Sequence, residues 1–473
     1  MRYLMGMVAL CLIHGSLFSQ HQDILEKPAT WKGDEHAGVD TTSLLHAFKA
    51  GHFRGHFRYF FMATDNRSGL TDHFAHAAGA GLHFETRPWH RFRLTMSGFF
   101  VFNLLSSDLG KRDSLSGQIS RYELGLFDIE DPDNRADIDR LEELFLSYKT
   151  RTWEARLGRQ LINTPFINLQ DGRMRPTLVE GIWVNAQPGK KLQLQAGWLS
   201  RVSPRSTTRW FSMAHSIGVY PAGLQLDGQP ARYQGQLESA GVATGGFNWQ
   251  VMPRLKIQAW DLWMDRVFNT ALLQADATVA KKGSSAWKAA AQVIRQDAIG
   301  AGGHEDPAMA YFPPNNHALT WGLQTAWTRK SWDVSLNYNR IAGNGRYLMP
   351  REWGRDPFFT FMPRERNEGF ADVHAAVVKL NHKKEGLPLK SSFAVGYFHL
   401  PDARNAALNK YGMPSYWQTN LDLRYAFQGW MQGLETQALI VYKGRAGETY
   451  GNPRFEFNKV NMWLFNLVIN YHF

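Results

Sequence analysis

The chain contains 473 residues with a formal net charge of +11, and 13% of its residues are aromatic. This length suits two or three soluble domains or one large β-barrel. Beyond the N-terminus no run of about eighteen apolar residues occurs and the mean hydropathy is negative, which excludes ordinary transmembrane helices but not membrane strands of about ten alternating residues.

Residues 1–19 have the layout of an export signal, with Arg2 as the positive start, residues 4–13 as the apolar core and residues 15–19 as the exit. We expect residues 20–49 to form an N-terminal periplasmic lead-in and residues 50–473 to form a single barrel domain. Cys11 is the only cysteine and lies in the signal, so the mature chain has no thiol for disulfides, metal ligation or catalysis. The basic excess indicates anionic partners, either solutes or lipopolysaccharide, rather than nucleic acid.

The first clean strand alternates Phe53, Phe57 and Phe61 with Arg54 and Arg58, so one face is aromatic and the other is cationic. The same period of two recurs in about eighteen segments, each of the length that a tilted transmembrane strand needs. They lie near residues 53–61, 74–84, 92–102, 141–149, 153–160, 179–187, 191–201, 239–250, 254–265, 267–276, 285–295, 318–329, 331–341, 370–380, 389–399, 417–427, 433–443 and 460–473.

The last of these segments places Trp463, Phe465, Leu467 and Ile469 on one face and ends on Phe473. An aromatic residue at the end of an apolar face is typical of a strand that reaches a membrane-water boundary. The segment resembles the C-terminal signal strand that outer-membrane barrels present to their insertion machinery. A half-buried edge strand of a soluble β protein would show the same period.

Short connections, such as those at residues 149–152, 252–254 and 329–331, largely alternate with long ones. Outer-membrane barrels have this layout, with tight periplasmic turns and long external loops, whereas a soluble sandwich has no reason to sort its loops. The sequence therefore predicts an all-β fold: a transmembrane antiparallel up-and-down β-barrel of about eighteen strands, with both termini in the periplasm.

One long connection, residues 160–177, is apolar in its first half and carries Asp171, Arg173 and Arg175 in its second. Loops that face bulk water are usually more polar than this. We therefore predict that the loop folds into the lumen and forms a pore constriction. In the alternative interpretation it is a surface loop whose arginines pair with Asp171 or bind lipopolysaccharide.

Four stretches, AFKAGHFRGHFRYFF, DIDRLEELFLSYKT, LGRQLINTPFINLQDGRMRPTLVEG and NLVINYHF, together resemble the OprD-type outer-membrane porins. The resemblance spans essentially the whole mature chain. It implies a monomeric 18-stranded barrel, narrowed largely by an inward-folded third external loop. It also implies a ladder of arginines on one pore wall, opposed by acidic groups, that guides small carboxylate-bearing solutes. The DGRMRP stretch matches the family's constriction segment, which assigns Arg173 to the constriction together with Asp171 and Arg175.

Basic residues on the polar faces of the strands should point into the lumen, because a charge facing lipid at mid-bilayer costs about 2 to 4 kcal/mol. Those on the early strands could form one cationic strip, although lumen arginines can also form salt bridges across the pore. The predicted pore-wall basic residues are Arg54, Arg58, Arg91, Arg93, Arg156, Lys256 and Arg424.

The acidic run from Asp128 to Asp139 lacks the Gly and the terminal Glu of a calcium loop. We interpret it as a solvated external loop, with divalent-cation binding as the weaker alternative. The 17 histidines show no ligand spacing. We therefore predict no metal site and no cofactor.

These features predict an outer-membrane porin that admits small carboxylate-bearing solutes, such as amino acids or small organic acids, by passive diffusion. No GxSxG motif or other compact catalytic constellation occurs, so we do not predict an enzyme. The alternatives are a phosphate- or anion-selective porin and a plugged barrel that acts as an adhesin or outer-membrane enzyme. The expected partners are outer-membrane lipid, lipopolysaccharide, small solutes and, through residues 460–473, the barrel-assembly machinery.

Overall fold

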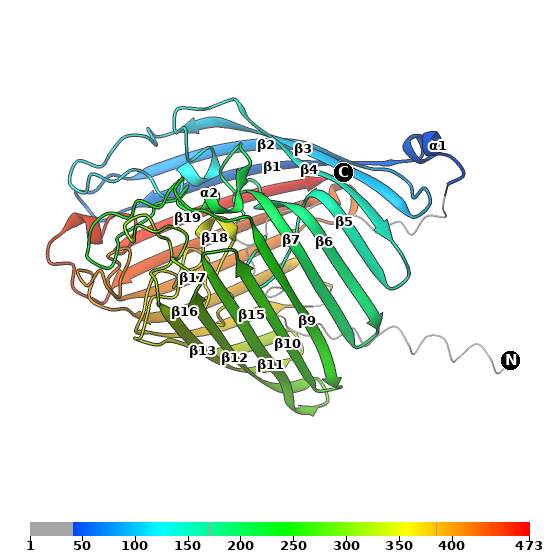
Figure 1. The fold of residues 1–473 in the computed structure, drawn as a ribbon. Coiled ribbons are helices and arrows are strands. Elements are labelled where there is room, and N and C mark those ends of the chain that lie inside the picture. Colours follow the sequence, from blue (N-terminus) through cyan, green and yellow to red (C-terminus); the bar gives the residue numbers. More distant parts are fainter. Residues whose placement is uncertain (1–40, 170–171, 385) are drawn as a thin grey trace.

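The computed structural model describes residues 41–169, 172–384 and 386–473, and its strands form one closed antiparallel sheet (Figure 1). Neighbours in sequence pair with one another around the sheet, and the last strand pairs with the first. The strands are β1 (His52–Asp65), β2 (His73–Glu85), β3 (Phe92–Ser106), β4 (Ile138–Lys149), β5 (Trp153–Gln160), β6 (Leu178–Gly189), β7 (Leu192–Ser203), β8 (Phe211–Ser212), β9 (Val242–Met252), β10 (Leu255–Met264), β11 (Phe268–Lys282), β12 (Ser285–Ala298), β13 (His317–Arg329), β14 (Trp332–Ile341), β15 (Val373–Lys383), β16 (Leu389–His399), β17 (Tyr416–Ala426), β18 (Leu434–Arg445) and β19 (Met462–His472).

The described part of the chain thus has 19 strands, of which β8 is a two-residue segment that pairs only with β7. The other eighteen form the barrel, since β7 also pairs with β9, and the predicted fold class is confirmed. The helices are short: α1 (Leu44–Lys49), α2 (Met213–Ser216), η1 (Leu124–Leu126), η2 (Arg351–Trp353), η3 (Gly429–Met431) and η4 (Pro453–Phe455). None of the described helices has the length and apolar character needed to cross a membrane.

The barrel closes where the C-terminal Phe473 meets the start of β1. Phe473 N donates to Gly55 O at 3.1 Å, and Gly55 N donates to Phe473 O at 2.7 Å. A Cβ on Gly55 would lie 2.2 Å from the Phe473 ring, so the ring can cover this point of β1 only because residue 55 is a glycine.

The two ends of the barrel differ in the length of their connections (Figure 1). At one end, called here the turn end, lie the short turns, the start of β1 and the C-terminus. At the other end, the loop end, lie the second loop (107–137), third loop (161–177), fourth loop (204–241), sixth loop (299–316), seventh loop (342–372) and eighth loop (400–415). The predicted alternation is confirmed, with one exception: residues 265–267 join β10 to β11 tightly at the loop end.

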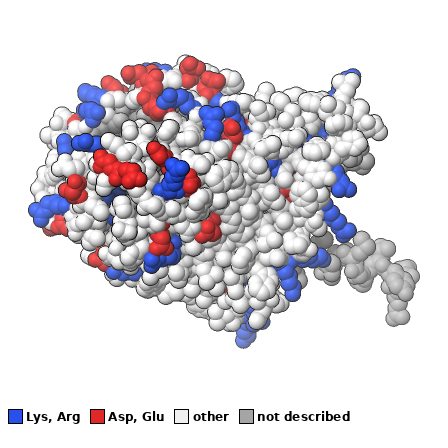
Figure 2. Space-filling view, in the orientation of Figure 1, with Lys and Arg blue, Asp and Glu red and all other residues white. Residues whose placement is uncertain are grey.

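The outer surface of the barrel is an apolar belt. Leu323 and Leu336, which alternate with buried polar residues, are 51% and 54% exposed. In Figure 2 charged residues gather at the loop end and at the opposite rim, with an uncharged zone between them. Aromatic pairs border this zone: Trp321–Tyr338, Tyr397–Trp417 and Tyr442–Trp463 near the loop end, and Phe92–Tyr148, Tyr148–Trp153 and Tyr425–Phe427 near the turn end. Two aromatic girdles around an apolar band are what a membrane-spanning barrel requires.

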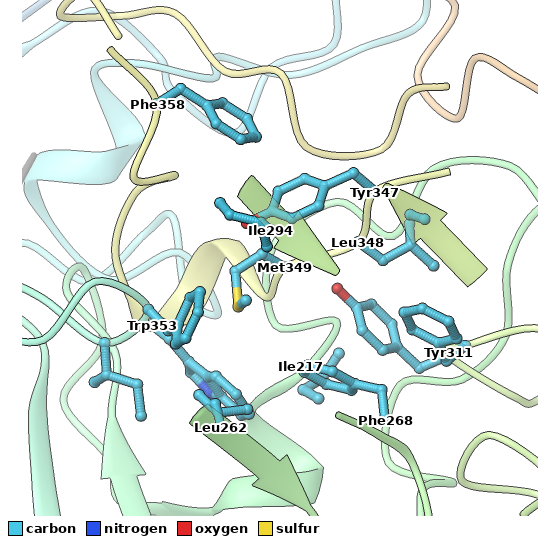
Figure 3. Packing of buried hydrophobic residues seen from close by; sticks show 14 of the residues in the cluster. Ile217, Leu262, Phe268, Ile294, Tyr311, Tyr347, Leu348, Met349, Trp353 and Phe358 are labelled. Carbon is cyan, nitrogen blue, oxygen red and sulfur yellow. The ribbon is translucent and has the colours of Figure 1, made fainter. Parts of the chain in front are cut away.

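The loop-end half of the lumen is packed by the long loops rather than left empty. Trp353 of the seventh loop is fully buried and donates from Nε1 to Ser216 Oγ of the fourth loop at 3.0 Å. Its ring stacks on Phe268 of β11, and Tyr347 and Phe358 pack together nearby (Figure 3). This apolar core holds the inward loops against the wall.

The lead-in contains a helix that the strand pattern did not predict. Ser43 caps α1 by accepting from His46 N at 3.1 Å, and Ala47 is buried. Arg87 N donates to Ala47 O at 3.0 Å, so α1 packs on the turn between β2 and β3. The first strand therefore begins after this helix, at His52. The expected signal, residues 1–19, and lead-in residues 20–40 lie outside the described residues.

Candidate functional site

The third loop folds into the lumen, as predicted, and rests on the seventh loop. Phe166 and Ile167 are buried, and Asn168 donates from its side-chain amide to Arg355 O and from its backbone to Trp353 O, both at 3.0 Å. Gly354 permits this approach, because its φ is 140° and a Cβ there would lie 2.6 Å from Asn168 Oδ1. Two inward loops therefore narrow the barrel together.

Arg175 anchors the third loop to the barrel wall. Its guanidinium donates to both carboxylate oxygens of Glu142 on β4, with Nε 2.6 Å from Oε1. Arg140 donates from Nη2 to Glu142 Oε1 at 3.0 Å and to Pro176 O at 2.7 Å. Arg175 also lies over the Phe99 ring at 4.1 Å. We call Arg140, Glu142 and Arg175 the clamp.

A β-bulge makes the clamp possible. The β3–β4 register shifts between Met96 and Gly98, so two successive residues of β4 face the lumen. Glu142 and Glu143 are both buried, and Glu143 N donates to Ser97 Oγ at 3.1 Å. Without the extra residue, one of these carboxylates would point into lipid.

Arg173, two residues before the clamp arginine, lies in different surroundings. Its backbone is left-handed, with φ at 53°, and its guanidinium carbon lies 6.0 Å from the Tyr122 ring of the second loop. Arg121 lies 5.5 Å from the same ring, and Lys443 Nζ of β18 donates to Arg364 O at 2.6 Å. We call Arg121, Arg173, Arg364 and Lys443 the cation cluster.

The positive charges of the cation cluster affect the pKa of Tyr122. Burial raises the pKa of this phenol, but the electrostatic effects of Lys443, Arg121, Arg173 and Arg364 lower it, and the net shift is downward. Three loops and one strand thus concentrate positive charge at one point of the lumen.

Acidic groups of the seventh loop lie near the cation cluster, since Lys443 acts electrostatically on Glu365. Burial raises the pKa of Glu365 to about 8, together with the like charge of Asp356. Burial also raises the pKa of Asp356 to about 6, against the effect of Arg366. Asp356 accepts from Asn367 N and Glu368 N, each at 3.2 Å. These carboxyl groups change charge between mildly acidic and mildly basic pH.

Of the predicted constriction residues, the structure brings Arg173 and Arg175 into the lumen, while Asp171 lies outside the described residues. Six of the seven predicted pore-wall residues share the lumen-facing parity of their strands. Three of these six are paired within the wall: Arg93 with Glu85 at 2.8 Å, Arg156 with Glu154 at 2.8 Å, and Arg424 with Asp422 at 3.1 Å. Lys256 lies opposite Asp276 in the β10–β11 register, and Arg54 and Arg58 lie on β1.

The seventh predicted wall residue, Arg91, is different. It precedes β3, which begins at Phe92, and it lies in the turn with a left-handed φ of 69° and an exposed side chain. Of the other six predicted wall residues, Arg58 lies furthest from the turn end of its strand. The other five lie within four residues of the turn end of their strands; they are Arg54, Arg93, Arg156, Lys256 and Arg424. They line the turn-end mouth, below the narrowed zone.

Sequence reasoning missed Glu142 and most of the cation cluster. The signal for Glu142 was present, since the exposed Leu141 and Leu144 are three residues apart and so break the period of two at LEEL. Arg121 and Arg364 lie in loops without periodicity, and no local pattern indicates where their side chains end. The acidic run also proved partly buried: Asp128 accepts from Thr208 Oγ1 at 3.1 Å. Among the residues that the structure describes, no group of three His, Cys, Asp or Glu is placed to hold a metal ion.

Comparison with known proteins identifies similar sequences and folds. A family model described as outer membrane porin, OprD family, matches residues 114–443. Pseudomonas aeruginosa OpdK, solved with vanillate, has a TM-score of 0.68 at 16% identity, covering 90% of this chain and 99% of that one. Acinetobacter baumannii OccAB2 has a TM-score of 0.67 at 15% identity, with coverages of 90% and 99%. Pseudomonas aeruginosa OccD3 (OpdP) has a TM-score of 0.66 at 15% identity, with coverages of 90% and 92%. No curated protein matches the sequence.

Proposed function

The chain belongs to the OprD family of outer-membrane porins, and on this premise we propose that it admits small carboxylate-bearing solutes past the cation cluster by passive diffusion. The family is one of channels, so no covalent step is part of the proposal. The protein resides in the outer membrane of a Gram-negative bacterium, where its apolar belt contacts lipid.

The observation that carries the proposal is the convergence of Arg121, Arg173 and Lys443 on Tyr122 in the zone that the third and seventh loops narrow. A fixed cationic group in a narrow, partly desolvated passage favours an anionic solute over a cationic one. Wall cations at the turn-end mouth contribute less, because carboxylates of the same wall neutralise several of them.

Carboxylates are the favoured anions for two reasons. Arginine presents a planar fork of donors that matches a carboxylate bidentately, and the cluster contains three arginines and one lysine. A fold relative at 16% identity was solved with vanillate, an aromatic carboxylate, which makes this class a reasonable first choice of probe.

The test is the reversal potential of the refolded protein in a planar bilayer under a potassium chloride gradient, for the wild type and Arg173→Ala. In water a charge about 7 Å from a permeating ion stabilises chloride by about 0.6 kcal/mol and destabilises potassium by a similar amount, so the chloride-to-potassium permeability ratio should fall roughly sevenfold in the variant. The matched control is Arg209→Ala, since Arg209 pairs with Glu130 outside the barrel and its side chain is 66% exposed.

Unchanged selectivity in Arg173→Ala would contradict the proposal, and so would cation selectivity of the wild type. Adding benzoate or phosphate at equal concentration separates the ligand classes: transient current blocks by benzoate alone support carboxylates, and blocks by phosphate alone favour a phosphate-selective porin. A folded barrel that shows no conductance would favour a plugged barrel instead.

We further propose that residues 1–19 direct export, that β19 presents the chain to the barrel-assembly machinery, and that exposed basic loop residues contact lipopolysaccharide. The alternating apolar face of β19 and its aromatic end support the second of these roles.

A further inference from the structure

Two arginines and one glutamate form a row on the outer surface of the barrel, across the neighbouring strands β5, β6 and β7 (Figure 1). Arg159 of β5 pairs with Glu180 of β6 in the sheet register, and Glu180 pairs with Arg201 of β7. Leu157 and Ile182, two residues away on the same strand faces, are 58% and 51% exposed, so these faces point outward. We call Arg159, Glu180 and Arg201 the outer row.

The outer row lies at the loop-end edge of the apolar belt. Toward the turn end, the outward faces of the same three strands carry Leu157, Ile182 and Trp198, all of them exposed. Trp198 also lies 6.5 Å from Trp263 of β10, as the aromatic pairs at the membrane boundary do. Lipid headgroups therefore meet the barrel at the outer row. In a barrel whose long loops are external, these headgroups belong to the outer leaflet.

The charges of the outer row do not cancel. Arg159 donates from Nε to Glu180 Oε2 at 3.0 Å, which neutralises one positive charge. Within the described ranges no carboxylate pairs with Arg201, whose Nη2 donates to Trp210 O at 3.1 Å. A guanidinium has five N–H donors, so both arginines retain donors for a further acceptor. The row therefore carries two cations and one anion, with donors to spare.

Residues 204–212, at the start of the fourth loop, complete the wall beside the outer row. β5 pairs with β4 only as far as Leu144, so the part of β4 nearer the loop end has no β5 neighbour. Trp210 covers this part and donates from Nε1 to Leu141 O at 3.4 Å. The segment then returns to β7 through the short strand β8. The indole ring of Trp210 is thereby held on the outer surface.

Trp210 positions both arginines of the outer row. Its ring centroid lies 4.7 Å from the guanidinium carbon of Arg159, and its carbonyl accepts from Arg201. The side chain of Arg159 is only 26% exposed, so it lies against the wall rather than extending into solvent. Arg209, the neighbour of Trp210, pairs with Glu130 and adds no net charge. The site is thus a pair of positioned guanidinium groups beside an indole ring, at the edge of an apolar surface.

We propose that the outer row binds one phosphate of the lipid A part of lipopolysaccharide, whose acyl chains lie on Leu157 and Ile182. The inference rests on the lipopolysaccharide contact of the proposed function and gives that contact a site. The phosphate balances the charge that Glu180 leaves uncompensated, and its oxygens match the planar donors of arginine. A lipid fits this site better than a free phosphate, because the adjoining apolar surface and indole ring suit an amphiphile.

The experiment is native mass spectrometry of the detergent-folded protein with lipid A and with dephosphorylated lipid A. EDTA is present, because divalent cations would otherwise bridge phosphates to carboxylates. We expect the wild type to bind lipid A roughly tenfold more tightly than the dephosphorylated lipid. Phosphatidylglycerol and inorganic phosphate, offered in place of lipid A, should both bind more weakly, because they present less apolar surface or none.

Three variants and a control assign the binding to the outer row. Arg159→Gln and Arg201→Gln should each lower the affinity for lipid A about threefold, and the double variant about tenfold. Glu180→Gln removes the negative charge between the arginines and should raise the affinity about threefold. A merely structural role would not give changes of opposite sign. Arg295→Gln is the matched control, since Arg295 lies near the loop end of β12 and pairs with Asp297, and it should leave the affinity unchanged.

Equal affinity of the wild type for lipid A and dephosphorylated lipid A would overturn the proposal, and so would equal binding of phosphatidylglycerol or of inorganic phosphate. Unchanged affinity in the double variant would overturn this site alone, since lipopolysaccharide would then bind elsewhere. A wild type that binds no lipid A would also contradict the lipopolysaccharide contact of the proposed function. None of these outcomes depends on the reversal potential of Arg173→Ala, so the passage of carboxylates is tested separately.

Discussion

Arg175 and Arg173 stand two residues apart in the third loop, yet one belongs to the clamp and the other to the cation cluster. Arg175 meets Glu142, which a β-bulge turns inward, and the carboxylate neutralises its charge. Arg173 turns through a left-handed residue toward Tyr122, where Arg121, Arg364 and Lys443 add charge of the same sign.

The contrast between Arg175 and Arg173 shows that the surroundings of a lumen arginine, and not its residue type, decide its role. A guanidinium bound bidentately to a buried carboxylate fixes a loop and contributes little net field. A guanidinium gathered with other cations contributes a field that a passing solute feels. Substitutions at four places in the molecule test this division.

Removing the carboxylate of the clamp should give the largest loss of stability. Glu142→Gln removes the carboxylate that pairs with both Arg140 and Arg175, which should cost about 3 to 5 kcal/mol. Urea unfolding of the detergent-folded barrel measures the loss. Glu448→Gln, at an exposed loop position, is the control and should change little. A cost below about 1 kcal/mol would mean that the clamp does not anchor the third loop.

The buried Glu365 near the cation cluster should make the stability of the folded protein depend on pH. The pKa of Glu365 in the folded protein, about 8, is above that of an unfolded glutamate, so its contribution to stability is fully present below about pH 4.5 and is lost as pH rises to 8. Glu365→Gln should flatten this dependence. Melting temperatures at pH 5, 7 and 9, with Glu448→Gln alongside, provide the measurement. The same pH dependence in the wild type and in Glu365→Gln would contradict the assigned direction.

Arginine-to-lysine substitutions separate the roles of Arg175 and Arg173 within the third loop. Arg175→Lys keeps the charge but loses the bidentate geometry, and should destabilise the barrel by about 1 to 2 kcal/mol. Arg173→Lys keeps the charge near Tyr122 and should leave ion selectivity almost unchanged. Urea unfolding and reversal potentials on both variants give the two readouts. If the effects were reversed, our assignment of the two arginines would be wrong.

The smallest effect is expected at the turn-end mouth. Arg156 pairs with Glu154 at 2.8 Å and lies over the Phe145 ring, so Arg156→Ala should change stability by less than about 1 kcal/mol. Its effect on the reversal potential should be smaller than that of Arg173→Ala, measured under the same salt gradient. An equal or larger effect would indicate that the turn-end mouth, rather than the cation cluster, sets the ion selectivity.

Much of the fold could be predicted because a strand has a period of two. Alternation at residues such as Trp332, Val334 and Leu336 identifies the strand and its lipid-facing side, and short connections identify the end to which each strand returns. The same period identified six lumen-facing cations. It does not give their height along the barrel axis, so it could not show that five of these six cations lie near the turn end.

The candidate site could be predicted from the sequence only where the composition of a loop indicated its position in the barrel. An apolar loop with clustered charges indicated an inward fold and placed Arg173 and Arg175 in the lumen. The partners of these arginines could not be predicted, because Glu142 depends on a local break in register and Tyr122 belongs to another loop.

The sequence by itself determined the closed barrel, the apolar belt and the inward course of the third loop, since these follow from local periodicity and from burial of apolar residues. The tertiary structure alone shows that Arg175 meets Glu142, that several cations gather around Tyr122, and that Trp210 lies against Arg159. These outcomes depend on contacts between loops separated by many residues, and no local pattern encodes the distance between two loop side chains.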